Sequence, residues 1–380
     1  MGSAVKMRWV FWASATVIAY AYVGYPLWLW LRSWWSPRPV MRGTATPSVS
    51  AVMVVRNEEA AVAAKLRNLL ALDYPPEKLE VVVVSDGSSD GTGASITSFA
   101  GNEARIRTLL KTEARGKAAG LNDAIDMAHG EVLLFTDVRQ LIERPALRLL
   151  IENFADPEVG AASGELMLGD PASGETGKGM GLYWRVEKKI REMESASGSV
   201  AGATGSIYCA RRALLDPLPE GTILDDVLLP MQVVRRGSRV IFDPRARAWD
   251  SPDLGQSREF SRKVRTLSGN YQLLQLAPWL LGASNAIRFE FFSHKLVRLV
   301  VPLALLALLA ASIFLTAPFY RAVLFAQLAF YALSLIAIGG VKTGPLGRIA
   351  DPARTFVVLN SAAVVAFVNF VTGRKAVWVR

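Results

Sequence analysis

The chain of 380 residues is 51% hydrophobic with a mean hydropathy of +0.27, which is too apolar for an ordinary soluble protein and predicts that part of it lies in lipid. Its net charge of +10 is spread along the sequence and largely flanks the apolar runs, a pattern that fits an anionic membrane surface and not nucleic acid. The single cysteine, Cys209, excludes an intrachain disulfide, and two histidines are too few for a histidine-based zinc cluster.

An uncharged run over residues 9–31 is long enough to cross a bilayer, so we expect a membrane helix there. The run is longer than the apolar core of a cleaved signal peptide. More basic residues follow it than precede it, which favours a cytoplasmic position for the next domain. We therefore predict that residues 1–47 form a transmembrane helix and a proline-bearing linker.

Short β-rich runs alternate with helical stretches over residues 48–272, which indicates a mostly parallel sheet with crossover helices. We expect strands over residues 49–55, 79–84, 106–110 and 132–135, and helices over 58–72 and 117–128. In open sheets of parallel strands, ligands bind at the carboxyl ends of the strands. The polar residues that follow these strands should converge there and form a nucleotide site; they are Arg56, Asn57, Glu58, Asp86 and Asp137.

The last block of the chain is again apolar. Residues 273–294 mix aromatic side chains with few charges, and we expect interfacial helices there. Residues 295–380 contain uncharged runs over 299–320, 322–341 and 355–372, each about long enough to span a bilayer. Three such spans plus the N-terminal one put the C-terminus outside, whereas Arg374, Lys375 and Arg380 favour the cytoplasm. The number of spans therefore stays open.

Short motifs follow one another through the middle block: Val-Val-Arg-Asn-Glu-Glu ending at Glu59, Ser-Asp-Gly-Ser-Ser-Asp ending at Asp90, Arg-Gly-Lys-Ala-Ala-Gly-Leu-Asn ending at Asn122, the strand end at Asp137, and Ile-Leu-Asp-Asp ending at Asp226. In this order and spacing the block resembles the family-two inverting glycosyltransferases of GT-A fold, in the membrane-embedded form related to cellulose, chitin and hyaluronan synthases. The resemblance runs over about residues 48–272. It implies a Rossmann-like α/β GT-A domain in the cytoplasm, with flanking transmembrane helices in a bacterial inner membrane.

The resemblance implies that Arg56, Asn57 and Glu58 border a nucleotide-sugar donor. It also implies that Asp86 accepts a hydrogen bond from the base, which favours uracil without excluding guanine. Lys117 would place a positive charge beside the donor phosphates. Each residue also has a purely structural interpretation: Asn57 as a helix cap, Asp86 and Asp137 as turn residues, and Lys117 as a solvated side chain.

Asp137 matches the first acidic residue of the family's metal-binding Asp-x-Asp motif, so the resemblance implies a magnesium or manganese ion held against the diphosphate. The sequence departs from the motif at Arg139, where the second acidic residue is expected. Either one carboxylate and substrate oxygens hold the metal, or Arg139 itself neutralises phosphate charge.

A stretch of small residues from Gly202 through Thr204 to Gly205 permits close approach of an acceptor sugar. Tyr183 and Trp184 either stack on that sugar or pack in the core. The resemblance also implies a role for the next acidic pair: Asp226 acts as general base toward the acceptor hydroxyl and Asp225 supports it. A helix N-cap ahead of an apolar run is the structural alternative.

A basic segment over residues 261–269 lies where processive relatives carry a Gln-Arg-x-Arg-Trp type of sequence. Arg265 fits the principal arginine and Lys263 its basic neighbour, and both would face the leaving diphosphate. Arg262 replaces the glutamine and Thr266 the tryptophan. Without that tryptophan, repeated and single transfer both stay open. A basic membrane-proximal helix is the structural alternative.

Together these features predict an inverting hexosyl- or N-acetylhexosaminyltransferase that uses a nucleotide-sugar, with UDP preferred, and acts in polysaccharide synthesis. Two alternatives remain: transfer of a single sugar to polyprenyl phosphate or another lipid acceptor, and an inactive nucleotide-sensing scaffold, which Arg139 and Thr266 suggest. The expected partners are the donor, a saccharide or lipid-linked acceptor, and membrane lipids, with no nucleic acid. The sequence indicates neither the sugar nor the oligomeric state.

Overall fold

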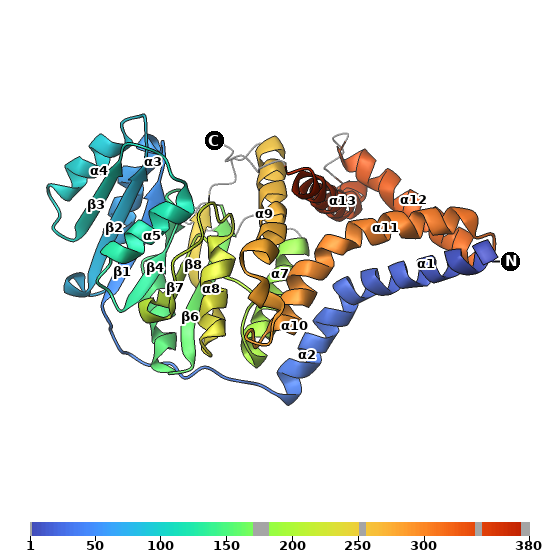
Figure 1. Cartoon of the computed structure of the whole chain (residues 1–380), viewed down its shortest axis with the longest axis horizontal. Helices are drawn as coiled ribbons and strands as arrows, with labels where there is room; N and C mark the ends of the chain where they lie inside the picture. Colours follow the sequence, from blue (N-terminus) through green and yellow to red (C-terminus); the bar gives the residue numbers. More distant parts are fainter. Residues whose placement is uncertain (1, 170–181, 251–255, 339–343, 374–380) are drawn as a thin grey trace.

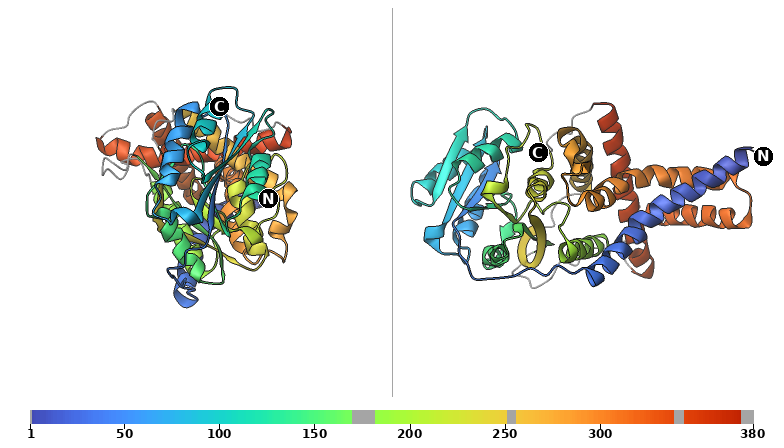
Figure 2. Two further views of the ribbon diagram at one scale, coloured as in Figure 1. Left: turned by 90° about the vertical axis from the view of Figure 1, so that its left-hand side faces the viewer. Right: turned by 60° about the horizontal axis from the view of Figure 1, so that its bottom comes forward.

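The structure, a computed structural model, describes residues 2–169, 182–250, 256–338 and 344–373. Arg374, Lys375 and Arg380, and the end of the apolar run expected over 322–341, lie outside these ranges. An α/β domain occupies one end of the molecule, and long helices extend from it to the other end (Figures 1 and 2).

Within the described residues, one sheet of eight strands forms in the order β3-β2-β1-β4-β7-β6-β8-β5. The strands are β1 Val49–Val55, β2 Leu79–Asp86, β3 Ile106–Lys111, β4 Val132–Phe135, β5 Leu141–Ile142, β6 Val159–Leu168, β7 Tyr208–Arg211 and β8 Arg239–Asp250. The first four strands pair in parallel, as do β6 and β8, while β7 runs antiparallel to both β4 and β6. The prediction of a mixed, mostly parallel GT-A-type sheet is confirmed.

Helices cover both faces of this sheet because its central strands are continuous runs of apolar residues. The helices of the domain are α3 Glu59–Leu70, α4 Thr92–Ala100, α5 Lys117–Met127, α6 Ala146–Ile151, α7 Leu182–Ser197 and α8 Asp225–Arg235. One face packs against apolar residues of α5 and α8, and the other against those of α3 and α6. Single turns occur at η2 Pro76–Lys78, η3 Glu152–Ala155 and η5 Arg212–Leu214.

The strand register brings the polar strand ends together. Val55 of β1 pairs with Ser85 of β2, so Asn57, just after β1, and Asp86, the last residue of β2, lie at the same edge. Asn57 is not the helix cap that the sequence suggested, because Glu58 holds the cap position of α3. Asn57 instead has a left-handed φ of 53°, and its Oδ1 accepts a hydrogen bond from Ser89 N at 2.8 Å.

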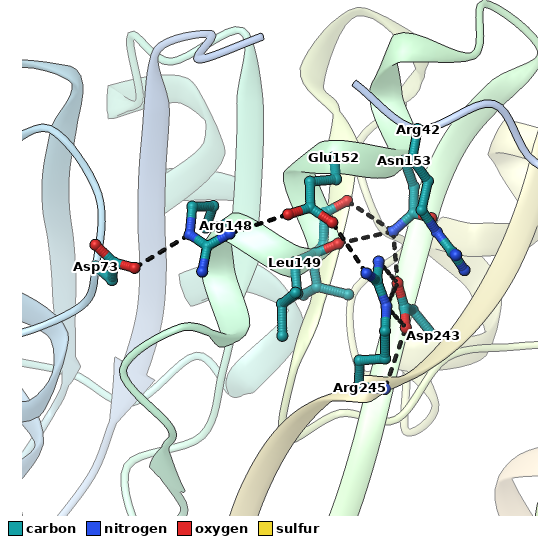
Figure 3. Close-up of polar contacts among 9 residues, drawn as sticks. Arg42, Asp73, Arg148, Leu149, Glu152, Asn153, Asp243 and Arg245 are labelled. Atoms are coloured by element: carbon teal, nitrogen blue, oxygen red, sulfur yellow. Dashed lines mark hydrogen bonds and ion pairs between the residues drawn. The ribbon is translucent and has the colours of Figure 1, made fainter. Parts of the chain in front are cut away.

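A polar network joins α6 and η3 to β8 (Figure 3). Asp243 is fully buried and accepts hydrogen bonds from Asn153 Nδ2 at 2.9 Å and from Arg245 Nη2 at 2.7 Å. Asn153 Oδ1 accepts a bond from Arg42 Nε at 3.2 Å. Arg245 also pairs with Glu152 at 3.0 Å. The linker that follows the N-terminal helix is thereby attached to η3 through Arg42.

The remaining described helices are α1 Gly2–Ala19, the π-helix η1 Tyr20–Gly24, α2 Tyr25–Trp35, α9 Gln256–Leu276, η6 Pro278–Leu281, α10 Arg288–Phe291, the π-helix η7 Phe292–Leu296, α11 Val297–Phe314, α12 Pro318–Ile338 and α13 Gly344–Val371. Helices α1 and α11 lie side by side (Figures 1 and 2). In the described residues four segments are long and apolar enough to cross a membrane: Ala4–Trp35, Arg288–Phe314, Pro318–Ile338 and Ala350–Val371. Large apolar side chains lie exposed along them, as lipid contact requires.

Two boundaries differ from the expected ones. The first C-terminal candidate span begins at Arg288, so the expected boundary at residue 294 falls inside a continuous helical segment. The same span ends at Phe314, whereas the apolar run was expected to continue to residue 320. The chain turns after Phe314, and Pro318 begins α12 because proline needs no hydrogen-bond acceptor in the first helical turn.

Candidate functional site

Lys117 joins two carboxylates at the carboxyl edge of the sheet. Its Nζ lies 3.0 Å from Oδ1 of Asp137 and 3.2 Å from Oδ2 of Asp225. Three elements supply these groups: the start of α5, the loop after β4, and the first turn of α8. Burial disfavours the charged ammonium, but Asp137 and Asp225 outweigh it and hold the pKa of Lys117 above its ordinary value. Three residues predicted from the sequence are thus brought together.

Asp86 fixes the loop that carries Lys117. Asp86 is buried, and its two carboxylate oxygens accept hydrogen bonds from Arg115 N and Gly116 N, each at 2.8 Å. Gly116 has a φ of 92°, a conformation that favours glycine, and α5 begins at the next residue. A carboxylate has lone pairs to spare beyond these two bonds, so a contact from Asp86 to a nucleobase stays a prediction.

Arg139 pairs with Glu58 across the site. Its Nη2 lies 2.9 Å from Glu58 Oε1, so the arginine that replaces an expected carboxylate balances the charge of another predicted donor residue. Arg56, which directly follows β1, is exposed. The side chains of Arg56 and Arg139 are therefore both accessible to a ligand at the carboxyl edge of the sheet.

The donor atoms for a metal ion are few. No group of three histidine, cysteine or acidic side chains that could hold a metal occurs in the part of the chain that the structure describes. Asp137 and Asp225 face a common space that the Lys117 ammonium fills. Magnesium is commonly held by one or two carboxylates together with substrate phosphates. Asp137 therefore fits as a single protein ligand, provided that Lys117 leaves Oδ1.

The acidic pair opens α8 and faces the small-residue stretch. Asp226 O accepts a hydrogen bond from Ala203 N at 2.7 Å, and a Cβ added to Gly205 would lie 3.1 Å from Asp226 Oδ2. Burial, followed by the charge of Asp225, raises the pKa of Asp226 to about 6, although Lys117 and Lys295 oppose the rise. The N-cap interpretation is wrong, because Leu224 holds that position and makes no side-chain cap bond.

Arg191 is a residue of this region that the sequence reasoning missed. It donates hydrogen bonds to Thr204 Oγ1 and, at 2.8 Å, to Ser163 Oγ, and its guanidinium lies 4.5 Å from the ring centroid of Phe242. Ser163 Oγ in turn accepts a bond from Thr204 N at 2.9 Å. Arg191 thereby holds the small-residue stretch in place. The spacing of charged residues along α7, one helical turn apart, was the sequence signal that could have identified Arg191.

Lys65 is a second residue that was missed. This fully buried lysine of α3 donates hydrogen bonds to Thr136 Oγ1 at 2.7 Å and to Gln140 O, and so fixes the loop that carries Asp137. Burial lowers the pKa of Lys65 to about 7 against the opposing charge of Asp137. A lysine among the apolar positions of an amphipathic helix was the available signal.

The remaining predicted residues lie on two helices near the membrane. Tyr183 and Trp184 are on α7 with their rings 6.1 Å apart in an edge-to-face arrangement, and Tyr183 lines a cavity beside the spans. Lys263 and Arg265 lie on α9, half-buried. Arg211 and Arg212, at the end of β7, donate hydrogen bonds to backbone carbonyls and are structural.

The sequence model of the protein family described as Glycosyl transferase family 2 matches residues 50–218. This match covers the sheet edge with Asp86, Lys117 and Asp137. Residues 50–218 form a family 2 glycosyltransferase domain. The family resemblance found in the sequence is therefore confirmed.

Curated relatives of this chain include a polysaccharide synthase and a probable glycosyltransferase. Poly-beta-1,6-N-acetyl-D-glucosamine synthase of Staphylococcus aureus (strain COL) is 26% identical over 250 residues, which is 64% of this chain and 57% of the relative. The probable glycosyltransferase YdaM of Bacillus subtilis is 24% identical over 260 residues, which is 65% of this chain and 61% of the relative. The chain thus matches under two thirds of the length of these curated relatives.

A solved structure shares the fold. A mannosyltransferase from Pyrobaculum calidifontis, determined in complex with GDP-Man and Mn2+, superposes with a TM-score of 0.72 and 24% sequence identity over 96% of this chain and 100% of that chain. The similarity extends beyond the family 2 domain, so the arrangement of the flanking helices also has a counterpart of known structure.

Proposed function

We propose that the chain is a membrane glycosyltransferase that moves a sugar from a nucleotide-sugar donor to a saccharide acceptor with inversion, in the synthesis of a polysaccharide. The placement of Asp226 carries this proposal. Its carboxylate faces Gly205 in the small-residue stretch, while Asp225 beside it connects through Lys117 to Asp137. A base and a cluster suited to a diphosphate therefore meet at one edge of the sheet.

The proposed reaction is a single displacement at the anomeric carbon of the donor sugar. The acceptor hydroxyl oxygen attacks the anomeric carbon, and the bond from that carbon to the diphosphate oxygen breaks with its electron pair leaving on the diphosphate. Asp226 takes the hydroxyl proton, since a base with a pKa of about 6 is mostly ionised at neutral pH. Attack opposite the leaving group inverts the anomeric configuration.

Positive groups stabilise the charge that develops on the leaving diphosphate. We assign this role to Lys117, with Lys263 and Arg265 of α9 approaching from the membrane side. Asp137 would hold a magnesium or manganese ion, which would supply further positive charge against the diphosphate. Asp86 would receive the base, with uracil favoured, and Arg56, Asn57, Glu58 and Arg139 would border the donor.

The transferred sugar is proposed to be a hexose or N-acetylhexosamine. The relatives named poly-beta-1,6-N-acetyl-D-glucosamine synthase support this class and support an extended saccharide product. The four candidate spans support a membrane location, which we propose to be the bacterial inner membrane with the family 2 domain in the cytoplasm.

The experiment is product analysis with the full chain reconstituted in lipid nanodiscs and supplied with UDP- and GDP-sugars in mixture. Mass spectrometry of the product identifies the sugar and the chain length, and NMR identifies the anomeric configuration. An extended β-linked saccharide supports the proposal. One sugar on a lipid supports the alternative of single transfer, and nucleotide binding without any product supports the inactive scaffold.

A further inference from the structure

The loop over residues 216–224 leads directly into the acidic pair, because α8 begins at Asp225. Leu224, the cap residue of α8, makes no side-chain cap bond, so no capping side chain fixes the first helical turn. Ala203 holds the backbone of Asp226 from the side of the small-residue stretch. On its other side, the position of Asp226 depends on what holds the loop.

Gln272 of α9 holds the end of this loop with both polar atoms of its amide. Its Nε2 donates a hydrogen bond to Gly221 O at 2.8 Å, and its Oε1 accepts one from Ile223 N at 2.9 Å. Ile223 lies only two residues before Asp225. One planar amide thus fixes two backbone groups of the loop, which sets the orientation of the loop as well as its distance from α9.

Gly269 lets α9 approach the same segment closely. A Cβ added to Gly269 would stand 2.5 Å from Leu224 Cγ and 3.1 Å from Ile223 Cγ2. Gly269 lies three residues before Gln272 and four after Arg265, a spacing that puts all three residues on one face of the helix. The face of α9 that includes a proposed diphosphate contact therefore also contacts the loop that leads to the proposed base.

Helix α9 is anchored to the spans independently of this loop. It lies between the family 2 domain and α13 (Figure 1). The ring centroid of Tyr271 is 5.1 Å from that of Phe370 and 6.0 Å from that of Phe367, and both phenylalanines belong to the candidate span Ala350–Val371. Loss of the Gln272 amide should therefore release the loop and leave the helix in place.

The far end of the loop is held by α5, the helix that begins with Lys117. Asn122 Nδ2 donates a hydrogen bond to Leu218 O at 2.9 Å, and Asn122 Oδ1 accepts one from Leu218 N at 2.8 Å. The loop is thus tied to the donor cluster at one end and to α9 at the other. Gln272 supplies the tie nearer to the acidic pair.

We propose that Gln272 is a positioning residue for the acidic pair. By holding Gly221 and Ile223 it sets where Asp226 stands relative to the acceptor hydroxyl, and it acts on the reaction through Asp226. Because α9 packs on a candidate span, the membrane helices contribute in this way to the geometry of proton removal. This inference rests on the proposed function, because it concerns the base of the same reaction.

The test is a double-mutant cycle of Gln272→Met and Asp226→Asn, with sugar transfer measured for the full chain in lipid nanodiscs. Methionine has a side chain of similar length but removes both hydrogen bonds. Gln272→Met alone should lower kcat at least about ten-fold, because small misplacements of a catalytic group are costly. In the Asp226→Asn background it should lower kcat by less than about two-fold, since the base that it positions is absent.

Gln275→Met changes an exposed glutamine of the same helix and is the matched control, which should keep kcat within about two-fold of wild type. Binding of UDP- and GDP-sugars is measured by titration calorimetry in the same samples. Gln272→Met should keep the wild-type stoichiometry and a Kd within about two-fold, because the Lys117 cluster is unchanged. A partly unfolded sample would instead bind fewer donor molecules.

Gly269→Ala tests the same contact from a second position. Alanine is favoured over glycine in a helix interior by about 1 kcal/mol, so the substitution should not weaken α9 itself. The added Cβ must displace Leu224, and kcat should again fall at least about ten-fold while donor binding is kept.

Four results would overturn the inference: an unchanged kcat in Gln272→Met, equal losses in Gln272→Met and Gln275→Met, a loss of donor stoichiometry that equals the loss of kcat, or the same loss with and without the Asp226 carboxylate. Wild-type protein whose transfer depends on Asp226, together with full kcat in Gln272→Met, contradicts this inference alone. Wild-type protein that transfers no sugar contradicts the proposed function as well.

Discussion

Gly205 lies so close to Asp226 that an added Cβ would stand 3.1 Å from Oδ2 of the carboxylate. Few real Cβ contacts are that short, so a side chain at position 205 must displace the carboxylate by a few tenths of an ångström. We expect Gly205→Ala to lower kcat by about ten-fold or more, because small misplacements of a catalytic group are costly. Steady-state sugar transfer checks this against Gly93→Ala, whose added Cβ would have only an ordinary contact. Equal rates for both variants would contradict the placement.

Replacing Lys117 removes the cation shared by Asp137 and Asp225. Lys117→Met leaves these two carboxylates facing one another and takes a positive charge from the proposed diphosphate position. We expect kcat/KM for the donor to fall at least about 100-fold, the size of loss seen when a preorganised electrostatic contact is removed. Lys189→Met, which removes an exposed lysine of α7, is the control. A loss confined to the acceptor KM would refute the donor assignment.

Removal of divalent cations tests the role of Asp137. We expect chelation to lower transfer at least about ten-fold and added magnesium or manganese to restore it, since the ion would oppose charge on the diphosphate. Arg139→Asp should strengthen metal binding, because it supplies a second carboxylate near Asp137 and releases Glu58 from its ion pair. Metal titrations of both proteins measure this. Transfer that chelation leaves unchanged would remove the metal from the mechanism.

The network at Asp243 should stabilise the family 2 domain. Burial raises the pKa of this carboxyl, but hydrogen bonds from Arg245 and Asn153 outweigh it and hold the value below the ordinary range. Arg245→Ala should therefore lower stability by about 1.5–3 kcal/mol at neutral pH. The difference should shrink as pH falls through the depressed pKa, where wild type also loses the ionised partner. Thermal melts of the full chain, with the exposed Arg144→Ala as control, measure both effects.

Much of the fold could be predicted because the strands are unusually clear. The runs that became β1 and β4 are continuous and apolar, so their ends were found to the residue. Parallel pairing then places Asp86 and Asp137 at one edge whatever the details of the loops. The ends of the spans were less well placed, since apolar composition does not reveal where Pro318 allows a new helix to start.

The site beyond the strand ends depends on contacts between residues distant in sequence. Arg191 donates hydrogen bonds to Ser163 and Thr204, and Lys65 of α3 donates one to Thr136. No local sequence pattern predicts these pairings. The pairing of Arg139 with Glu58 explains how the site accommodates arginine, but it also requires the fold to bring β1 and β4 side by side. The cavity likewise exists only where α7, α9 and α13 meet.

The pH dependence of transfer by wild type and Asp226→Asn tests the central claim that Asp226 is the base. Because the pKa of Asp226 is raised to about 6, wild-type kcat/KM should increase as pH rises through that value and then level off. In Asp226→Asn, kcat/KM should fall at least about 100-fold and should no longer rise near pH 6. Asp216→Asn, which changes a surface ion pair, should keep the wild-type kcat/KM and its rise near pH 6. An Asp226→Asn protein that retains full transfer and the same pH profile would contradict the account.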